Sequence, residues 1–316
     1  MTNKPDSSSA SRTLFAAVLE TKNYIVGEAN APSGLYRRGE GEWTHTGWRN
    51  LRCAAVAVDA STPKTIFLAS GNGVLRSRDG GTTWRVTTDW RVAEVLDVML
   101  DPFQAGAVFA ASAYGLWHSA DAGESWDALP PAAPYPNATF TPALALDRTQ
   151  PGRLLVGTEA GLFVSEDAGQ SWTSVGPRMA VRALEQSETQ PAVWLAGTDG
   201  AGILRSADGG ATWSASESGA TIYAVALDPS DPRRMAATGF ETGLLVTTDG
   251  GASWTQRPLD IEAQALHALA FDPDGSGRLW LGSVGEGVFF TDDLGLTCED
   301  AGLPETTVYD FAFAAA

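Results

Sequence analysis

The chain has 316 residues and a formal net charge of −17, from 38 Asp and Glu against 21 Lys and Arg. This charge disfavours nucleic acid and anionic membranes as partners, because both are polyanions. No apolar run reaches the roughly 20 residues of a transmembrane helix. The three histidines and two cysteines show no metal-binding spacing such as Cys-x-x-Cys.

The first segment, residues 1–12, is polar, lacks the apolar core of a signal peptide, and is predicted to be a disordered tail. We therefore expect a cytoplasmic protein, and we expect it to be a monomer. The next segment, Thr13 to Glu20, has the composition of a β-strand. The Gly- and Pro-containing stretch Thr21 to Gly34 follows, and it has two open interpretations, a lid or an ordinary loop.

From here an eight-residue pattern, Ser/Thr-x-Asp-x-Gly-x-Ser/Thr-Trp, recurs along the chain. A shortened copy ends at Trp43, and later copies end at Trp84, Trp126, Trp172, Trp213, Trp254 and, in degenerate form, Cys298. Spacings of 41 to 46 residues indicate one supersecondary unit copied along the chain. We expect the repeated Asp to accept backbone N–H bonds in a turn and the Trp to anchor neighbouring units, which are structural roles.

Each unit contains four short apolar runs separated by turn residues, as in a propeller blade. The seven predicted first strands are Cys53–Asp59, Val95–Asp101, Thr141–Asp147, Val181–Ser187, Ile222–Asp228, Leu266–Asp272 and Val308–Ala315. The last of these ends the chain, whereas Thr13–Glu20 matches a second strand. The sequence therefore predicts an all-β protein, a single seven-bladed β-propeller of four-stranded blades over residues 13–316. Its C-terminal strand pairs in the N-terminal blade and closes the ring.

The repeated pattern resembles the Asp-box, or bacterial neuraminidase repeat. That superfamily includes sialidases, sortilin-type propellers, xyloglucanases and photosystem II assembly-factor propellers. The resemblance covers Leu14 to Ala315 and implies the propeller fold. It does not select a function, because these proteins are variously enzymes, receptors and assembly factors. The six-bladed sialidases also carry an Arg-(Ile/Leu)-Pro signature that this sequence lacks.

Function is expected where the repeat is broken. At the inner-strand position of Ala224 five blades carry Ala, but two carry Asp97 and Asp310. Neighbouring positions bring in Glu185 and four polar or aromatic residues. All should converge at the upper mouth of the axial channel, on the face of the inter-blade loops. The candidate catalytic residues are Asp97, Glu185, Asp310, His267 and Tyr309.

The inter-blade loops add exposed aromatic residues next to arginines, a combination suited to sugar stacking or to a protein hot spot. The candidate binding residues are Trp48, Arg49, Arg52, Trp90, Arg91, Tyr135, Arg178, Arg182 and Tyr223. A purely structural alternative is that Arg182 neutralises the channel acids.

Two classes of function stay open. The first is a non-catalytic propeller that binds a small molecule, a carbohydrate or a protein on its upper face, as an assembly factor or scaffold would. The alternative is a glycosidase- or lyase-like enzyme that uses the acids at the channel mouth. We predict no cofactor and no metal site; a Ca²⁺ or Mg²⁺ ion at Asp97, Glu185 and Asp310 is the alternative.

Overall fold

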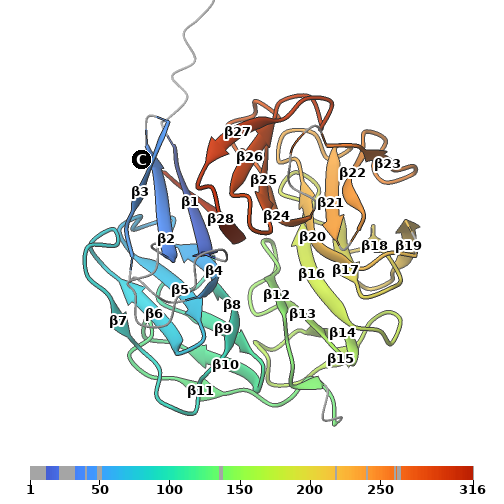
Figure 1. Ribbon diagram of the computed structural model, residues 1–316. Coiled ribbons are helices and arrows are strands. Elements are labelled where there is room, and N and C mark those ends of the chain that lie inside the picture. Colours follow the sequence, from blue (N-terminus) through green and yellow to red (C-terminus); the bar gives the residue numbers. More distant parts are fainter. Residues whose placement is uncertain are drawn as a thin grey trace, which may run out of the picture.

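The computed structural model describes residues 12–20, 33–39, 41–47, 52–134, 138–217, 219–239, 241–259, 261 and 265–315. In this part of the chain, seven four-stranded antiparallel sheets are arranged as blades around a central axis (Figure 1). This is the all-β, seven-bladed propeller that the sequence predicts. Within the same residues, no helix has the length and apolarity needed to cross a membrane.

The innermost strand of each blade lines the axis, and the second strand packs outside it. The innermost strands, from blade one to blade seven, are β28 (Thr306–Ala315), β4 (Cys53–Val58), β8 (Val95–Leu100), β12 (Ala143–Leu146), β16 (Val181–Gln186), β20 (Ile222–Leu227) and β24 (Leu266–Phe271). The second strands are β1 (Arg12–Glu20), β5 (Ile66–Ser70), β9 (Val108–Ser112), β13 (Leu154–Thr158), β17 (Trp194–Thr198), β21 (Met235–Gly239) and β25 (Leu279–Ser283).

The outer half of each blade follows the same order. The third strands are β2 (Gly34–Gly39), β6 (Gly73–Ser77), β10 (Gly115–Ser119), β14 (Gly161–Ser165), β18 (Ile203–Ser206), β22 (Gly243–Thr247) and β26 (Val288–Thr291). The outermost strands are β3 (Glu42–His45), β7 (Arg85–Val86), β11 (Asp127–Ala128), β15 (Thr173–Ser174), β19 (Ser214–Glu217), β23 (Thr255–Arg257) and β27 (Glu299–Gly302). Burial falls from the second strand outward: β5 is fully buried, whereas β7 is exposed.

Blade one is built from both ends of the chain, as predicted. The C-terminal strand β28 pairs antiparallel with β1, in a register that runs from Arg12 opposite Ala315 to Glu20 opposite Thr306. Because β28 supplies the innermost strand of blade one, all seven blades have four strands and the ring closes without a gap. The two terminal strands lie side by side in Figure 1.

The hydrophobic core is distributed between neighbouring blades. Phe15 and Leu35 of blade one form one buried cluster with Ile66 and Leu68 of blade two. The faces pack so closely that some positions admit only glycine. A Cβ atom added to Gly282 of blade seven would lie 2.7 Å from the Cβ of Val308 in blade one.

The repeated Asp forms a turn between the third and fourth strands on the lower face, which is the face opposite the inter-blade loops. In blade two, Asp79 Oδ1 accepts hydrogen bonds from the Thr83 backbone N–H at 2.8 Å and the Ser77 hydroxyl at 2.8 Å. Asp79 Oδ2 accepts from the Thr83 hydroxyl at 2.6 Å. Equivalent turns are formed by Asp121, Asp167, Asp208, Asp249 and Asp293.

The tryptophans that end these turns contact the preceding blade. The Trp84 indole N–H donates to the carbonyl of Thr46, and the Trp126 N–H lies 3.3 Å from the Thr87 hydroxyl oxygen. The inter-blade anchoring expected from the sequence is therefore present. These side chains are only half-buried, however, whereas the strand residue Trp194 is fully buried.

Candidate functional site

A β-bulge recurs at one level in six of the seven innermost strands. In β8, for example, the pairing with β9 skips from Val95 to Asp97. A bulge leaves one residue unpaired and re-aims its side chain. The skipped residues are Ala54, Leu96, Arg182, Tyr223, His267 and Tyr309, and all line the axial cavity. The bulges therefore explain why four of the pattern-breaking residues converge on the axis as predicted: Arg182, Tyr223, His267 and Tyr309.

The axial cavity has a volume of about 970 Å³, in the upper range for ligand pockets. It runs along the inner strands, from Arg52 and Tyr309 near their upper ends to Arg148 and Pro273 near their lower ends. We call its upper end the channel mouth; it is lined by Arg52, Phe140, Pro142, Arg182, Tyr223, His267 and Tyr309.

Four side chains of the channel mouth form a continuous arc across blades two, one, seven and six, which we call the aromatic arc. The Arg52 guanidinium lies over the Tyr309 ring, 4.7 Å from its centroid. Tyr309 meets His267 edge-on at 4.9 Å between centroids, and His267 stacks on Tyr223 at 5.6 Å. Each side chain in the arc is thus held in place by its neighbour.

Burial lowers the pKa of His267, and the positive charge of Arg52 lowers it further. The imidazole is therefore neutral at pH 7, and its two nitrogens have different roles. Its Nδ1 is buried and has no hydrogen-bond partner among the described residues. The arc thus presents a neutral imidazole between two phenols and one guanidinium.

Arg182 extends the channel mouth through blade five. Its Nη2 donates to Asp199 Oδ2 at 2.8 Å, and Asp199 Oδ1 accepts from the Thr221 hydroxyl at 2.9 Å. Glu159 lies 3.8 Å from Arg182 Nη1. The proposal that Arg182 neutralises Asp97, Glu185 or Asp310 is therefore wrong, because its carboxylate partners come from strand hairpins on the upper face.

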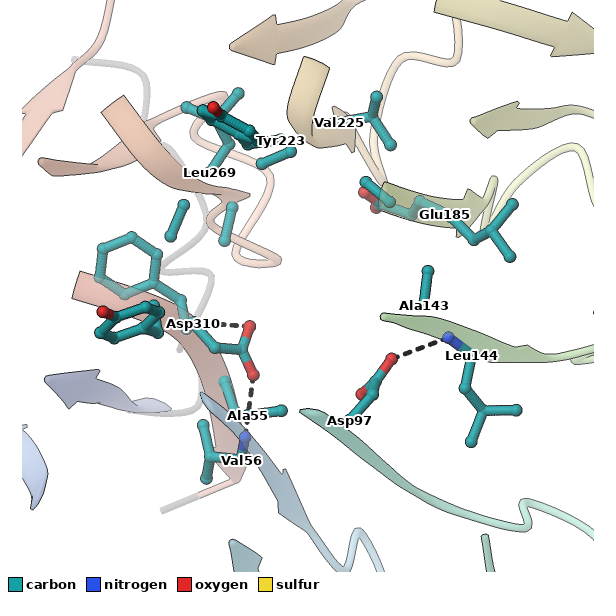
Figure 2. A pocket seen from close by; sticks show the side chains of 18 of the residues that line it. Ala55, Val56, Asp97, Ala143, Leu144, Glu185, Tyr223, Val225, Leu269 and Asp310 are labelled. Atoms are coloured by element: carbon teal, nitrogen blue, oxygen red, sulfur yellow. Dashed lines mark hydrogen bonds between the residues drawn. The ribbon is translucent and has the colours of Figure 1, made fainter. Parts of the chain in front are cut away.

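Two of the cavity acids tie their blade to the next one. Asp97 of blade three accepts the Leu144 N–H of blade four at 2.9 Å, and Asp310 of blade one accepts the Val56 N–H of blade two at 2.9 Å. Figure 2 shows both carboxylates reaching from one inner strand to its neighbour. Each uses its other oxygen for the N–H of the residue that follows it. These carboxylates satisfy backbone donors on inner strand edges.

Glu185 of blade five faces the Leu227 N–H of blade six, which lowers the pKa of Glu185 and so offsets part of the effect of burial. Burial raises the pKa of all three carboxyl groups, to about 7 for Asp97 and Asp310 and to about 8 for Glu185. The negative charge of Asp97 raises the pKa of Asp310 further. The side chains keep partial access to the cavity, so solvent or a ligand can reach them.

The predicted binding residues divide into three groups. Arg52, Arg182 and Tyr223 lie at the channel mouth. Trp90, Arg91 and Arg178 do not line the cavity; Trp90 is 88% exposed, and Arg91 pairs with Asp89 at 2.6 Å. The third group, Trp48, Arg49 and Tyr135, lies outside the described residues, as does most of the predicted loop, residues 21–32.

Sequence reasoning missed Asp199 and Thr221, because neither belongs to an inner strand. Asp199 follows β17 at the start of a hairpin, and Thr221 precedes β20. In the described part of the chain, no three His, Cys, Asp or Glu side chains form a group that could hold a metal ion.

No protein-family model and no curated protein matches the sequence. Among solved structures, a GH74 enzyme of Niastella koreensis is 18% identical with a TM-score of 0.71, covering 84% of this chain and 50% of that one. YCF48 bound to D1 peptide is 19% identical with a TM-score of 0.59, covering 78% of this chain and 81% of that one. The extracellular domain of BT4673 from B. thetaiotaomicron is 15% identical with a TM-score of 0.67, covering 89% and 38%.

The chain shares its propeller fold with these structures. Identities below 20% establish this shared architecture and no more. The present chain spans only half of the Niastella enzyme. The similar structures include both a glycoside hydrolase and a peptide-bound protein, so they do not choose between catalysis and binding.

Proposed function

We propose that the protein is a non-catalytic binding propeller that holds a segment of a partner protein at its channel mouth. The observation that carries this proposal is the aromatic arc. Arg52, Tyr309, His267 and Tyr223 are held by mutual stacking and open onto a cavity of ligand size. Preorganised aromatic and arginine side chains are typical anchors for a protein partner.

The hydrogen bonds of the acids favour binding over catalysis. Both oxygens of Asp97 and both oxygens of Asp310 accept backbone N–H groups. A catalytic acid or base must exchange a proton with its substrate, and these bonds compete with that exchange. The bridges to the next blade are a structural role that explains why these two blades have Asp at the position where the other five have Ala.

A polypeptide ligand is favoured over a small molecule by the exposed residues beside the mouth. Trp90 and Tyr114 are exposed on adjacent loops of the upper face, which are joined by the Ala113 N–H to Glu94 carbonyl bond. A chain that entered the mouth could extend over both. YCF48, a propeller of similar fold, is bound to D1 peptide.

A peptide-display selection on the purified protein tests this proposal. We expect selected peptides to bind the wild type and to lose about tenfold or more in affinity for Arg52→Ala and Tyr309→Ala, since each removes an anchor. Asp208→Asn, on the lower face, is the matched control and should bind normally. Selected peptides that bind all three variants equally would contradict a site at the mouth.

A second candidate, an enzyme acting on a carbohydrate, is favoured by one observation. The raised pKa values of Asp97, Asp310 and Glu185 would suit a general acid near neutral pH. Assaying a panel of glycosides and polysaccharides with the wild type and with Asp97→Asn and Glu185→Gln separates the two functions. If the wild type turns over a substrate and the folded variants do not, the protein is an enzyme and the binding proposal is wrong.

A further inference from the structure

The basic residues are concentrated at one end of the chain. Residues 1–91 hold 12 of the 21 Lys and Arg but only 8 of the 38 Asp and Glu. The first 91 residues therefore carry a net charge of +4, and residues 92–316 carry −21. Blades one and two, which contain strands β1 to β7, lie next to each other in the ring (Figure 1). The described part of this segment forms a basic sector in an otherwise acidic disc.

Three arginines of blade two converge on one carboxylate in this sector; we call Arg76, Arg78 and Arg85 the arginine cluster. Glu124 of blade three is contacted by Arg76 Nη2 at 2.7 Å, Arg78 Nη2 at 3.1 Å and Arg85 Nη1 at 3.0 Å. One negative charge thus faces three positive charges. Arg76 is buried and also donates to the Ala122 carbonyl, whereas Arg78 and Arg85 are 59% and 64% exposed.

The arginine cluster keeps unused donors toward solvent. Each guanidinium has five N–H groups, and the hydrogen bonds described for Arg78 and Arg85 use one on each. Asp79 is adjacent in sequence, but its oxygens are bonded within the turn to Ser77 and Thr83. Lys64 contributes another exposed base beside this turn, because its carbonyl accepts the Gly80 N–H.

The arginine cluster breaks the repeat. In blades three to seven the three equivalent positions hold a single arginine in all, Arg205, and the remaining residues are neutral, acidic or His118. The propeller therefore does not need three arginines at these positions. The contact with Glu124 shows that these arginines can bind a carboxylate from a neighbouring segment, here from blade three.

We propose that the arginine cluster is a docking surface for an acidic segment of a partner polypeptide. Arginine pairs with carboxylates through two parallel N–H bonds, which gives geometric selectivity as well as charge attraction. A short acidic segment fits a sector of two blades, whereas a long polyanion such as nucleic acid would also meet the acidic remainder of the ring. This surface lies on the third and outermost strands, away from the channel mouth, and does not depend on the function proposed there.

Fluorescence anisotropy with a labelled peptide of alternating Glu and Ser tests this inference, at about 50 mM salt where exposed charges still act. The full-length wild type should bind, and Arg78→Gln with Arg85→Gln should weaken binding about tenfold. Arg85→Gln alone is compared with Arg233→Gln, which removes the same charge from an exposed, Asp-paired arginine in blade six. The Arg233 variant should stay within about twofold of the wild type.

Four results would overturn the inference. The first is a wild type that does not bind the peptide at this salt concentration. The second is that Arg233→Gln weakens peptide binding as much as Arg85→Gln does, which would mean that net charge alone explains the effect. The third is self-association of the wild type in sedimentation experiments that Arg85→Gln abolishes, which would make a second copy the occupant. The fourth is tighter binding of a DNA duplex than of the acidic peptide.

Discussion

Two sets of acidic residues lie at different levels of the same blades and behave in opposite ways. The turn aspartates of the lower face, such as Asp208, accept hydrogen bonds from hydroxyl and backbone groups, and these bonds lower the pKa of Asp208 to about 2. The cavity acids also accept backbone hydrogen bonds, yet burial raises the pKa of Asp97 and of Asp310 to about 7. Desolvation decides the difference, because the turns are exposed to bulk water, whereas the cavity acids lie inside the channel and are only partly accessible.

This contrast separates the repeated acids from the exceptional ones. A turn aspartate closes its own turn and recurs in six blades. A cavity acid instead reaches from its own blade to the backbone of the next, at a position where most blades have Ala. The repeated residues stabilise single blades, and the exceptional residues join neighbouring blades around the axis.

The largest effect is expected from a deletion that removes an inner strand of the cavity but keeps every lower-face turn. Deleting residues from Glu305 onward removes β28 and Asp310, and it should abolish the cooperative thermal transition, since blade one would lose its inner strand. Circular dichroism against temperature measures this. Asp310→Asn is the matched full-length control and should still melt cooperatively. A truncated protein with an unchanged melting temperature would mean that the lower-face turns suffice to hold the ring.

A second comparison sets a core tryptophan against a turn tryptophan. Trp194→Ala should cost about 3–5 kcal/mol of unfolding free energy, because the side chain is fully buried between blades four and five. Trp213→Ala should cost less, about 1–3 kcal/mol, because this side chain is half-buried. Urea denaturation of both variants gives the two values. An equal or larger loss for Trp213→Ala would show that the turns carry more stability than burial indicates.

A smaller effect distinguishes the two sets of acids by pH. Burial raises the pKa of Asp97 from 3.8 to about 7, so this carboxyl group stays protonated to a higher pH in the folded state than in the unfolded state. The stability contributed by this group is therefore present below pH 4 and is lost as the pH rises through 7. Asn does not titrate, so the stability of Asp97→Asn relative to the wild type should rise by about 1–3 kcal/mol between pH 5 and about 8, whatever the difference is at pH 5.

Asp208→Asn should show the opposite dependence on pH. Hydrogen bonds from Thr212 and Ser206 lower the pKa of Asp208 from 3.8 to about 2, so its contribution is present above pH 4 and is lost as the pH falls through 2. This variant should be less stable than the wild type at pH 7, with the deficit shrinking in acid. Chemical denaturation at several pH values checks both variants. If the stability of Asp97→Asn and of Asp208→Asn relative to the wild type changed with pH in the same way, the cavity acids and the turn aspartates would not differ as described.

The sequence predicted the fold closely because the repeat fixes both the number of blades and the strand positions. The convergence of Asp97, Asp310 and Tyr309 also followed from aligning the inner strands. The bulges could not be predicted, because they are a property of backbone pairing. The donors to the carboxylates are the backbone N–H groups of Val56 and Leu144, which leave no signature in the sequence. The partner of Arg182 was missed because Asp199 lies on a separate hairpin.

The most direct test of this account is a carboxyl ¹³C NMR titration that resolves Asp97, Asp310 and Asp208. We expect apparent pKa values of about 7 for the two cavity acids and of about 2 for Asp208. Titration of Asp97 and Asp310 near the ordinary value of 3.8 would contradict it, because these side chains would then be as well solvated as the exposed turns.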